Sequence, residues 1–382
     1  YPIKESLHTI DNNLHIYQYN FGKGTIIIHP FNVNDLYNTH CFSRKKFYDT
    51  KNELPSEVVA DISKADIRKV LFICLKLLWN FIGLPLIRNW YFPNNNKTIF
   101  CFRVDTDFGK SKDVTELYNL CKKYKISATW FIETSSNDML SNIYNKLEGQ
   151  ELAFHGNKHL VYNSLEKNLH NINSGLKKFA KNKLSHSSGF AAPFGEWNES
   201  LADAMENIFT YSSEFTYDYD NFPLFPIINN NFSKVLQIPI HPISIGRLKR
   251  SHYSSNEMKQ YFERIIKNKS LNNEPIILYH HPHNKSLDII EFIFKKIKNN
   301  HIKNLTMTEF NNFWRDRLLL NREEFLLNEN TLICCNNIDA PFNVQLIKND
   351  KLALINQKKV DLRTIKLRKN IAIHAPRDIK RI

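Results

Sequence analysis

The sequence has little glycine and proline, 10 and 14 residues in a chain of 382. This scarcity excludes collagen-like and low-complexity chains. Its six cysteines form no CxxC pair, and Cys334 and Cys335 are adjacent, a placement that disulfide geometry disfavours. We expect a reduced compartment, or a protein indifferent to disulfides. The sequence shows no initiator methionine and no basic-then-apolar leader, which favours a cytoplasmic location.

Long apolar runs are also lacking, apart from residues 70–87 (VLFICLKLLWNFIGLPLI). Lys76, Asn80 and Pro85 interrupt this run, which is shorter than the roughly 20 apolar residues that span a bilayer. The run therefore predicts a buried or interfacial helix and no transmembrane helix. Association with a membrane surface is the alternative for this segment.

The composition is otherwise that of globular domains, with 42% hydrophobic, 13% aromatic and 24% charged residues. The length is sufficient for two or three domains. The chain has a net charge of +14, and residues 340–382 alone hold eleven basic and three acidic side chains. This basic segment predicts either a surface for an anionic partner or a solvated face of a small accessory domain. No nucleic-acid-binding signature accompanies it, so no nucleic-acid partner is predicted.

Three parts follow one another along the chain. Residues 1–96 predict a strand hairpin and then a helical pattern over 56–84, as at the end of a larger α/β domain. Residues 97–321 alternate strand and helix patterns, which is typical of parallel strands joined by crossover helices. Residues 322–382 predict a small basic β-sandwich. Its short strands are expected at 331–335, 343–347, 352–355 and 371–374.

Two carboxylates, Asp105 and Asp107, follow the first predicted strand of the central part. Alternate residues of a strand point to one side, and strand carboxyl ends carry the chemistry of α/β barrels. An acidic turn that caps the next segment is the other interpretation. About fifty residues later, His155 and His159 stand at i and i+4, which predicts two imidazoles on one face of a helical turn. With Asp107 they would leave a coordination position open for water, the pattern of catalytic zinc.

Two further motifs also follow predicted strands. Pro193, Phe194 and Gly195 predict a rigid turn, whose backbone N–H groups could face a reacting oxygen or could merely close the turn. His280 and His281 come directly after an apolar strand pattern. A histidine at that place is suited to general-acid catalysis, and the competing interpretations are a third metal ligand or a surface cluster.

In this order, D-x-D, HGxxH, PFG and LYHHP, the motifs resemble those of the NodB-homology polysaccharide deacetylases, carbohydrate esterase family 4, over residues 98–320. The resemblance implies an α/β fold, a distorted (β/α)7-type barrel, with the N-terminal partial α/β segment and the C-terminal β-sandwich outside it. It implies that Asp105 is the catalytic base. It also implies a bound Zn²⁺, or another divalent metal such as Co²⁺, Mn²⁺ or Ni²⁺, held by Asp107, His155 and His159.

The resemblance also assigns the remaining site residues. The Phe194 N–H would hold the oxyanion, and His281 is preferred to His280 as the general acid. The substrate-binding residues would be Pro193, Trp197, Tyr217 and Asp220.

One departure from the family pattern stands at Ala191, where the family usually has an arginine that pairs with the catalytic aspartate. Arg103 precedes Asp105 by two residues, and strand alternation puts both on one side if the strand is regular. The ionisation and orientation of Asp105 therefore depend on which residue replaces the missing arginine.

The predicted function is that of a metal-dependent hydrolase of non-peptide carbon–nitrogen bonds. It would remove N-acetyl groups from an amino sugar of a cell-envelope or surface polysaccharide and release acetate. The alternatives are a hydrolase of the same fold acting on another C–N amide or an O-acetyl ester, and an inactive glycan-binding module. The expected partner is a carbohydrate, and the sequence indicates no oligomeric state. The resemblance favours a location in the cell envelope, whereas the missing leader favours the cytoplasm.

Overall fold

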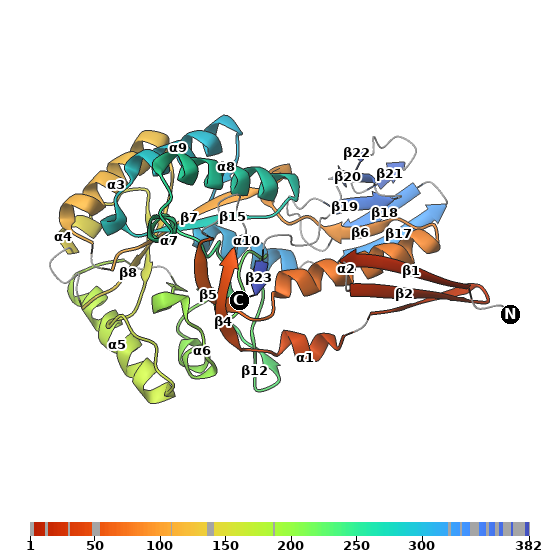
Figure 1. Cartoon of the computed structure of the whole chain (residues 1–382), viewed down its shortest axis with the longest axis horizontal. Helices are drawn as coiled ribbons and strands as arrows, with labels where there is room; N and C mark the ends of the chain where they lie inside the picture. Colours follow the sequence, from red (N-terminus) through yellow and green to blue (C-terminus); the bar gives the residue numbers. More distant parts are fainter. Residues whose placement is uncertain are drawn as a thin grey trace. The chain divides into compact units, whose positions relative to one another are not determined.

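The computed structural model describes residues 4–11, 14–29, 31–47, 54–107, 109–135, 141–185 and 188–319, and seven strands within residues 322–381. The chain divides into two units (Figure 1). The central unit comprises Asn38–Ala65, Lys97–Asn312 and Arg377–Ile382. The flanking unit comprises Tyr1–Tyr37, Asp66–Asn96 and Phe313–Pro376. The three-part division expected from the sequence stays a prediction.

The central unit is built on a parallel sheet, with strands in the order β14-β11-β10-β9-β8-β7-β15 and β16 also paired with β7. The strands are β7 Ile99–Asp105, β8 Thr129–Ile132, β9 Glu151–Phe154, β10 Gly189–Phe190, β11 Tyr211–Ser212, β14 Leu236–Gln237, β15 Ile276–His280 and β16 Lys303–Asn304. Every residue of β7 is buried, as expected of a parallel strand that is covered on both faces. A short antiparallel pair, β12 Ile227–Ile228 and β13 Asn231–Phe232, lies outside this sheet.

Helices join these strands and lie outside the sheet (Figure 1). They are α3 Ser111–Tyr124, α4 Ser141–Tyr144, α5 Leu165–Lys181, α6 Glu199–Met205, α7 Ile245–Arg250, α8 Ser255–Leu271, α9 Leu287–Asn299 and α10 Met307–Leu319. The local sequence explains where several of them begin. Ser164, Asn198 and Ser254 cap α5, α6 and α8, because each side chain accepts a hydrogen bond from a backbone N–H of the first turn.

The parallel sheet is curled. The backbone N–H of His241, which follows β14, donates to the Ile277 carbonyl of β15 over 2.9 Å. Since β14 and β15 stand at opposite ends of the strand order, this bond brings the two edges of the sheet together. The predicted distorted barrel is confirmed as a curled half-barrel of parallel strands with helices around it (Figure 1).

A β-hairpin from earlier in the chain belongs to the central unit and packs beside its parallel sheet. It consists of β4 Phe42–Phe47 and β5 Ser56–Ala60, and β23 Ile379–Arg381 pairs with β4. The Ala60 N–H donates to the Phe215 carbonyl over 3.1 Å. These contacts attach the hairpin to the segment that follows β11.

The helical pattern predicted over 56–84 is wrong for its first residues, which form β5. Val58 and Val59 are β-branched, and burial alternates over the first four residues of the strand. Both features favour a pleated, half-buried strand over a helix.

The helix expected over 70–87 also ends early. α2 spans Lys64–Phe81, and the chain then turns at Gly83, whose φ of +72° suits glycine. β6 Leu86–Asn89 follows directly. Among the described residues, no helix is long and apolar enough to cross a membrane.

The flanking unit contains antiparallel sheets. β1 Lys4–Asp11, β2 Leu14–Phe21 and β3 Gly24–Ile28 form one, followed in the chain by α1 Val33–Tyr37. The other two are β17-β18-β21 and β22-β20-β19-β6. Their later strands are β17 Arg322–Asn328, β18 Thr331–Asn336, β19 Val344–Lys348, β20 Lys351–Ile355, β21 Lys359–Asp361 and β22 Arg368–Lys369. The first three strands predicted there are confirmed, and the fourth, at 371–374, lies outside the described residues.

Candidate active site

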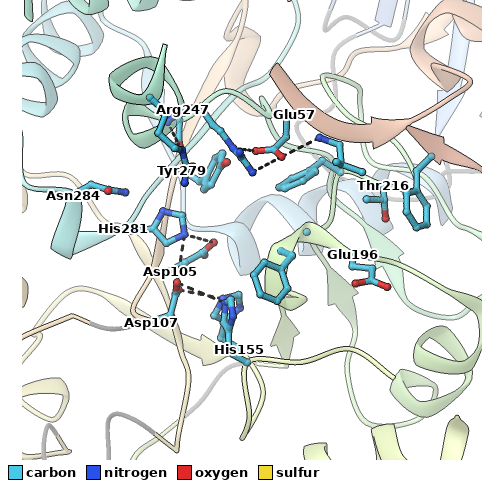
Figure 2. Close-up of a pocket in the computed structure, with 18 of the residues that line it drawn as sticks. Glu57, Asp105, Asp107, His155, Glu196, Thr216, Arg247, Tyr279, His281 and Asn284 are labelled. Atoms are coloured by element: carbon cyan, nitrogen blue, oxygen red, sulfur yellow. Dashed lines mark hydrogen bonds and ion pairs between the residues drawn. The ribbon is translucent and has the colours of Figure 1, made fainter. Parts of the chain in front are cut away.

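The four sequence motifs meet at the carboxyl edge of the parallel sheet. Asp105 ends β7, His155 follows β9, Phe194 follows β10 and His281 follows β15. Backbone bonds continue the sheet past its strand ends, as where the His155 N–H donates to the Ile132 carbonyl over 3.0 Å. Side chains from distant parts of the sequence therefore line one cavity of about 500 Å³ (Figure 2). Its size is within the range of small-molecule sites.

Asp107, His155 and His159 form the cluster expected to hold a metal. One ligand atom from each lies within 4.8 Å of the others. The Asp107 carboxylate lies 3.4 Å from Nε2 of His155 and 3.6 Å from Nε2 of His159. Nδ1 of His155 donates to the Ala191 carbonyl over 2.7 Å. Because a carbonyl only accepts, Nδ1 carries a proton, which leaves Nε2 available to bind a metal when the imidazole is neutral.

The chemistry of this cluster fits a divalent cation. Oδ1 of Asp107 is buried and has no hydrogen-bond partner among the described residues. Burial would raise the pKa of Asp107, but His155, His281 and His159 hold it well below its usual range. An ionised carboxylate with two imidazole nitrogens is the donor set of catalytic zinc sites.

The segment from His155 to His159 is a loop, so the prediction of a helical turn is wrong. Gly156 has a φ of +92°, outside the helical region. Asn171 of α5 holds the loop from the side. Its Oδ1 accepts from the Lys158 N–H over 2.8 Å, and its Nδ2 donates to the Lys158 carbonyl over 3.2 Å. The loop still brings the two imidazoles together, with ring centroids 5.3 Å apart.

Arg103 pairs with Asp105, as expected if β7 is regular. Nε donates to Oδ1 over 2.6 Å and Nη2 donates to Oδ2 over 2.8 Å, with both side chains buried. Nη1 donates to the Ser213 carbonyl over 2.6 Å. Burial would raise the pKa of Asp105, but Arg103, His155 and His281 lower it below its usual value. Arg103 thus orients the Asp105 carboxylate and keeps it ionised, although Ala191 stands where the family has arginine.

Of the two adjacent histidines, His281 lines the cavity and His280 does not. Nε2 of His281 lies 4.0 Å from Asp105 and 3.7 Å from Asp107 (Figure 2). His280 is fully buried, and burial lowers its pKa to about 3. His283, which also lines the cavity, contacts the Asp107 carbonyl through Nδ1 over 3.0 Å.

The turn at Pro193–Gly195 borders the candidate metal ligands. Phe194 adopts a left-handed conformation with a φ of 58°, and its ring stands edge-on to His159, with centroids 4.5 Å apart. Gly195 also has a positive φ, and a Cβ there would lie 2.2 Å from the ring of Phe215. The turn is therefore closed by packing that only glycine permits.

Four residues expected to bind substrate do not line the cavity: Pro193, Trp197, Tyr217 and Asp220. Trp197 and Tyr217 are buried against one another, with ring centroids 4.6 Å apart. Asp220 forms ion pairs with His241 and Lys269, each over 2.8 Å. Their part in substrate binding stays a prediction.

Sequence reasoning missed one side of the cavity. We call this side the outer wall, and it consists of Arg44, Glu57, Arg247 and Arg250. We call the opposite side the floor, and it consists of Asp105, Asp107, His155, His159 and His281. Figure 2 shows Glu57 and Arg247 across the cavity from Asp107 and His155. The β-branched pattern of β5 was the local signal for the strand, but no local signal predicts that Glu57 meets Arg247, far along the chain.

The motifs and the sheet agree with a comparison against protein families. Residues 101–209 match the family model described as polysaccharide deacetylase. The resemblance to polysaccharide deacetylases is confirmed. The deacetylase-like segment contains the predicted base and all three predicted metal ligands, and it ends before His281. No curated protein matches this sequence.

Comparison with solved structures finds matches of low sequence identity. One described as a probable polysaccharide deacetylase from Pseudomonas aeruginosa PAO1 is 11% identical, with a TM-score of 0.50 over 63% of this chain and 97% of that chain. Puue allantoinase is 11% identical, with a TM-score of 0.49 over 59% and 93%. The peptidoglycan deacetylase PdaC from Bacillus subtilis is 15% identical, with a TM-score of 0.39 over 59% and 94%. At these identities the similarity concerns the fold alone.

Proposed function

We propose that this chain is a divalent-metal-dependent deacetylase that removes N-acetyl groups from an amino sugar of a cell-envelope or surface polysaccharide. The observation that carries the proposal is the floor of the cavity. It combines a three-residue donor set for a metal, a carboxylate paired with a buried arginine, and a histidine within 4.0 Å of both aspartates. A metal-dependent hydrolase of acetamides can use such residues as metal ligands, general base and general acid.

Asp107, His155 and His159 would hold the metal. When bound, such an ion supplies Lewis-acid activation of water and of the substrate carbonyl at neutral pH. The hydrogen bond from His155 Nδ1 to Ala191 orients one ligand from outside. Oδ1 of Asp107, buried and without a hydrogen-bond partner among the described residues, would be available to the ion.

The other floor residues would move the protons. Asp105, held ionised by Arg103, would take a proton from the attacking water. The Phe194 N–H would donate to the oxyanion that forms as the water oxygen bonds to the carbonyl carbon. His281 would give a proton to the departing nitrogen as the C–N bond breaks. Burial lowers the pKa of His281, which makes its protonated form a stronger acid. The products are acetate and a free amino sugar.

Metal content and acetate release together test this function. The purified chain would be assayed by mass spectrometry for metal and with N-acetylglucosamine oligomers for acetate. We expect about one metal ion per chain, and we expect His155→Ala to lose the ion and to lower kcat/KM by more than about a hundredfold. His170→Ala changes an exposed histidine of α5 and serves as the matched control.

Two outcomes would contradict the proposal. A protein that binds no metal, even after reconstitution with zinc, would contradict the proposed metal-dependent hydrolase function. A metal-loaded protein that releases acetate from no acylated sugar would instead favour an inactive glycan-binding module.

A further inference from the structure

The outer wall of the cavity is rich in arginine. Arg44 comes from β4, and Arg247 and Arg250 come from α7. None of the three lies in the segment 101–209 that matches the deacetylase family. The wall is therefore a feature of this chain beyond the matched segment.

One of these three cations is neutralised. Arg247 binds the buried carboxylate of Glu57 with two hydrogen bonds, from Nε to Oε2 and from Nη2 to Oε1, the second over 2.6 Å. This bidentate pair links β5 to α7 in the lining of the cavity (Figure 2).

The other two cations have no such partner. Among the described residues, neither Arg44 nor Arg250 forms an ion pair with a carboxylate, and Nη1 of Arg44 reaches only the Ser56 hydroxyl, over 3.4 Å. Both side chains are exposed, yet both line the cavity. Burial and the nearby charge of Arg247 lower the pKa of Arg250, and Arg44 adds to the repulsion.

Among the described residues, no carboxylate of the cavity lining forms an ion pair with Arg44 or Arg250, although the charge of Glu57 also acts on Arg250. Glu57 is paired with Arg247, Asp105 is paired with Arg103, and Asp107 belongs to the candidate metal cluster. Glu196, at the turn that follows Phe194, is the remaining carboxylate of the lining, and among the described residues it forms no ion pair with Arg44 or Arg250. Two guanidinium groups are therefore left to attract an anion at the open side of the cavity.

We propose that Arg44 and Arg250 form a subsite for an anionic group of the substrate, a carboxylate or a phosphate. The inference rests on the proposed deacetylase function, since it defines which acetylated sugar the cavity selects. A guanidinium presents a planar set of N–H donors that matches the oxygens of both groups. The acetamide would lie at the floor while a charged group of the same or a neighbouring sugar lies at the outer wall.

Matched substrates test this subsite and distinguish its two candidate ligand groups, a carboxylate and a phosphate. The zinc-loaded full chain would be assayed for acetate release from three compounds: N-acetylglucosamine oligomers, oligosaccharides in which N-acetylglucosamine alternates with glucuronate, and N-acetylglucosamine 1-phosphate. Arg44→Gln and Arg250→Gln each remove one cation from the subsite. Lys46→Gln removes one from the same strand, at an exposed residue outside the cavity lining, and is the control.

We expect one of the two acidic substrates to have a higher kcat/KM than the neutral oligomer. The ratio of acidic to neutral kcat/KM should fall about tenfold in each arginine variant and stay constant in the control, because a hydrogen bond to a charged group is lost. Preference for the glucuronate compound would identify a carboxylate, and preference for the phosphate compound would identify a phosphate. A ratio that is equal in the natural protein and in both arginine variants would overturn the subsite.

Calorimetric titration of the same sugars separates this inference from the deacetylase function. Acidic sugars that bind to the natural protein, and bind about tenfold more weakly to the arginine variants, would keep the subsite even if no acetate were released. Equal binding of acidic and neutral sugars, or no binding of either, would overturn the proposed subsite.

Discussion

The floor and the outer wall of the cavity are built in different ways. The floor residues stand at or just after the ends of buried parallel strands, and hydrogen bonds of 2.6 and 2.7 Å hold Asp105 to Arg103 and His155 to the Ala191 carbonyl. Both unpaired arginines of the outer wall are exposed, and they come from a hairpin and a short helix added beside the barrel. In the proposed function, the chemistry would belong to the sheet and the selectivity to the segments beside it.

The largest effect is expected from the floor. Asp105→Asn removes the proposed base but keeps the size of the side chain. We expect kcat to fall by about 10²–10⁴-fold, the usual contribution of general-base catalysis, with the metal content unchanged. Acetate release and metal analysis on the same sample check this, with Asp203→Asn on the exposed side of α6 as control. Normal turnover in Asp105→Asn would assign the base to another residue.

A smaller effect is expected from Arg103, which contacts the floor residue Asp105 but does not line the cavity. Arg103→Met removes the guanidinium whose charge lowers the pKa of Asp105 against the effect of burial. The pKa of Asp105 should then rise, so the base is protonated over a wider range and activity is lost first at the acidic side. The acidic limb of the kcat/KM profile should move to higher pH.

Arg103→Lys is the comparison for this experiment, because it keeps the charge and loses the bidentate geometry. It should move the acidic limb less than Arg103→Met does. Circular dichroism on both variants would separate this effect from loss of the fold, since breaking a buried pair costs about 3–5 kcal/mol. An unmoved acidic limb in folded Arg103→Met would show that Arg103 does not control Asp105.

The smallest effect on stability is expected from the outer wall. Burial raises the pKa of Glu57 even though Arg247 lowers it, so the attraction of the pair does not exceed the cost of burying the carboxylate. Because Arg247 is partly exposed, Glu57→Gln should change the free energy of unfolding by less than the roughly 3–5 kcal/mol that breaking a fully buried pair costs, as read from thermal unfolding. It would also release Arg247 and raise the acidic-to-neutral ratio of kcat/KM severalfold. A large drop in Tm would instead make the outer wall a structural element.

Sequence reasoning predicted the floor because each floor residue follows a strand with its own local pattern. The motifs placed Asp105 and Asp107 after one predicted strand and His281 after another, and the family resemblance assigned their roles. The pairing of Arg103 with Asp105 could be suggested from strand alternation, but it required β7 to stay regular up to its last residue. The helical turn at the HxxxH motif failed because a positive φ at Gly156 overrides the i, i+4 spacing.

The outer wall could not be predicted in the same way. The sequence of β5 also fits the helical pattern that continues into α2, and the segment forms a strand because it pairs with β4. The pair of Glu57 and Arg247 joins residues that only the folded barrel brings together. Such long-range contacts have no periodic signature in a single sequence.

The bonds from Asn171 to Lys158 bear on the entropy of ligand binding. Because one buried amide holds both the N–H and the carbonyl of Lys158, the loop between the two histidines loses its conformational freedom when the chain folds. A cation that enters the site then has little backbone left to order, so more of its interaction energy appears as affinity. The spacing of His155 and His159 is a property of the folded protein, which an arriving ion would find already set.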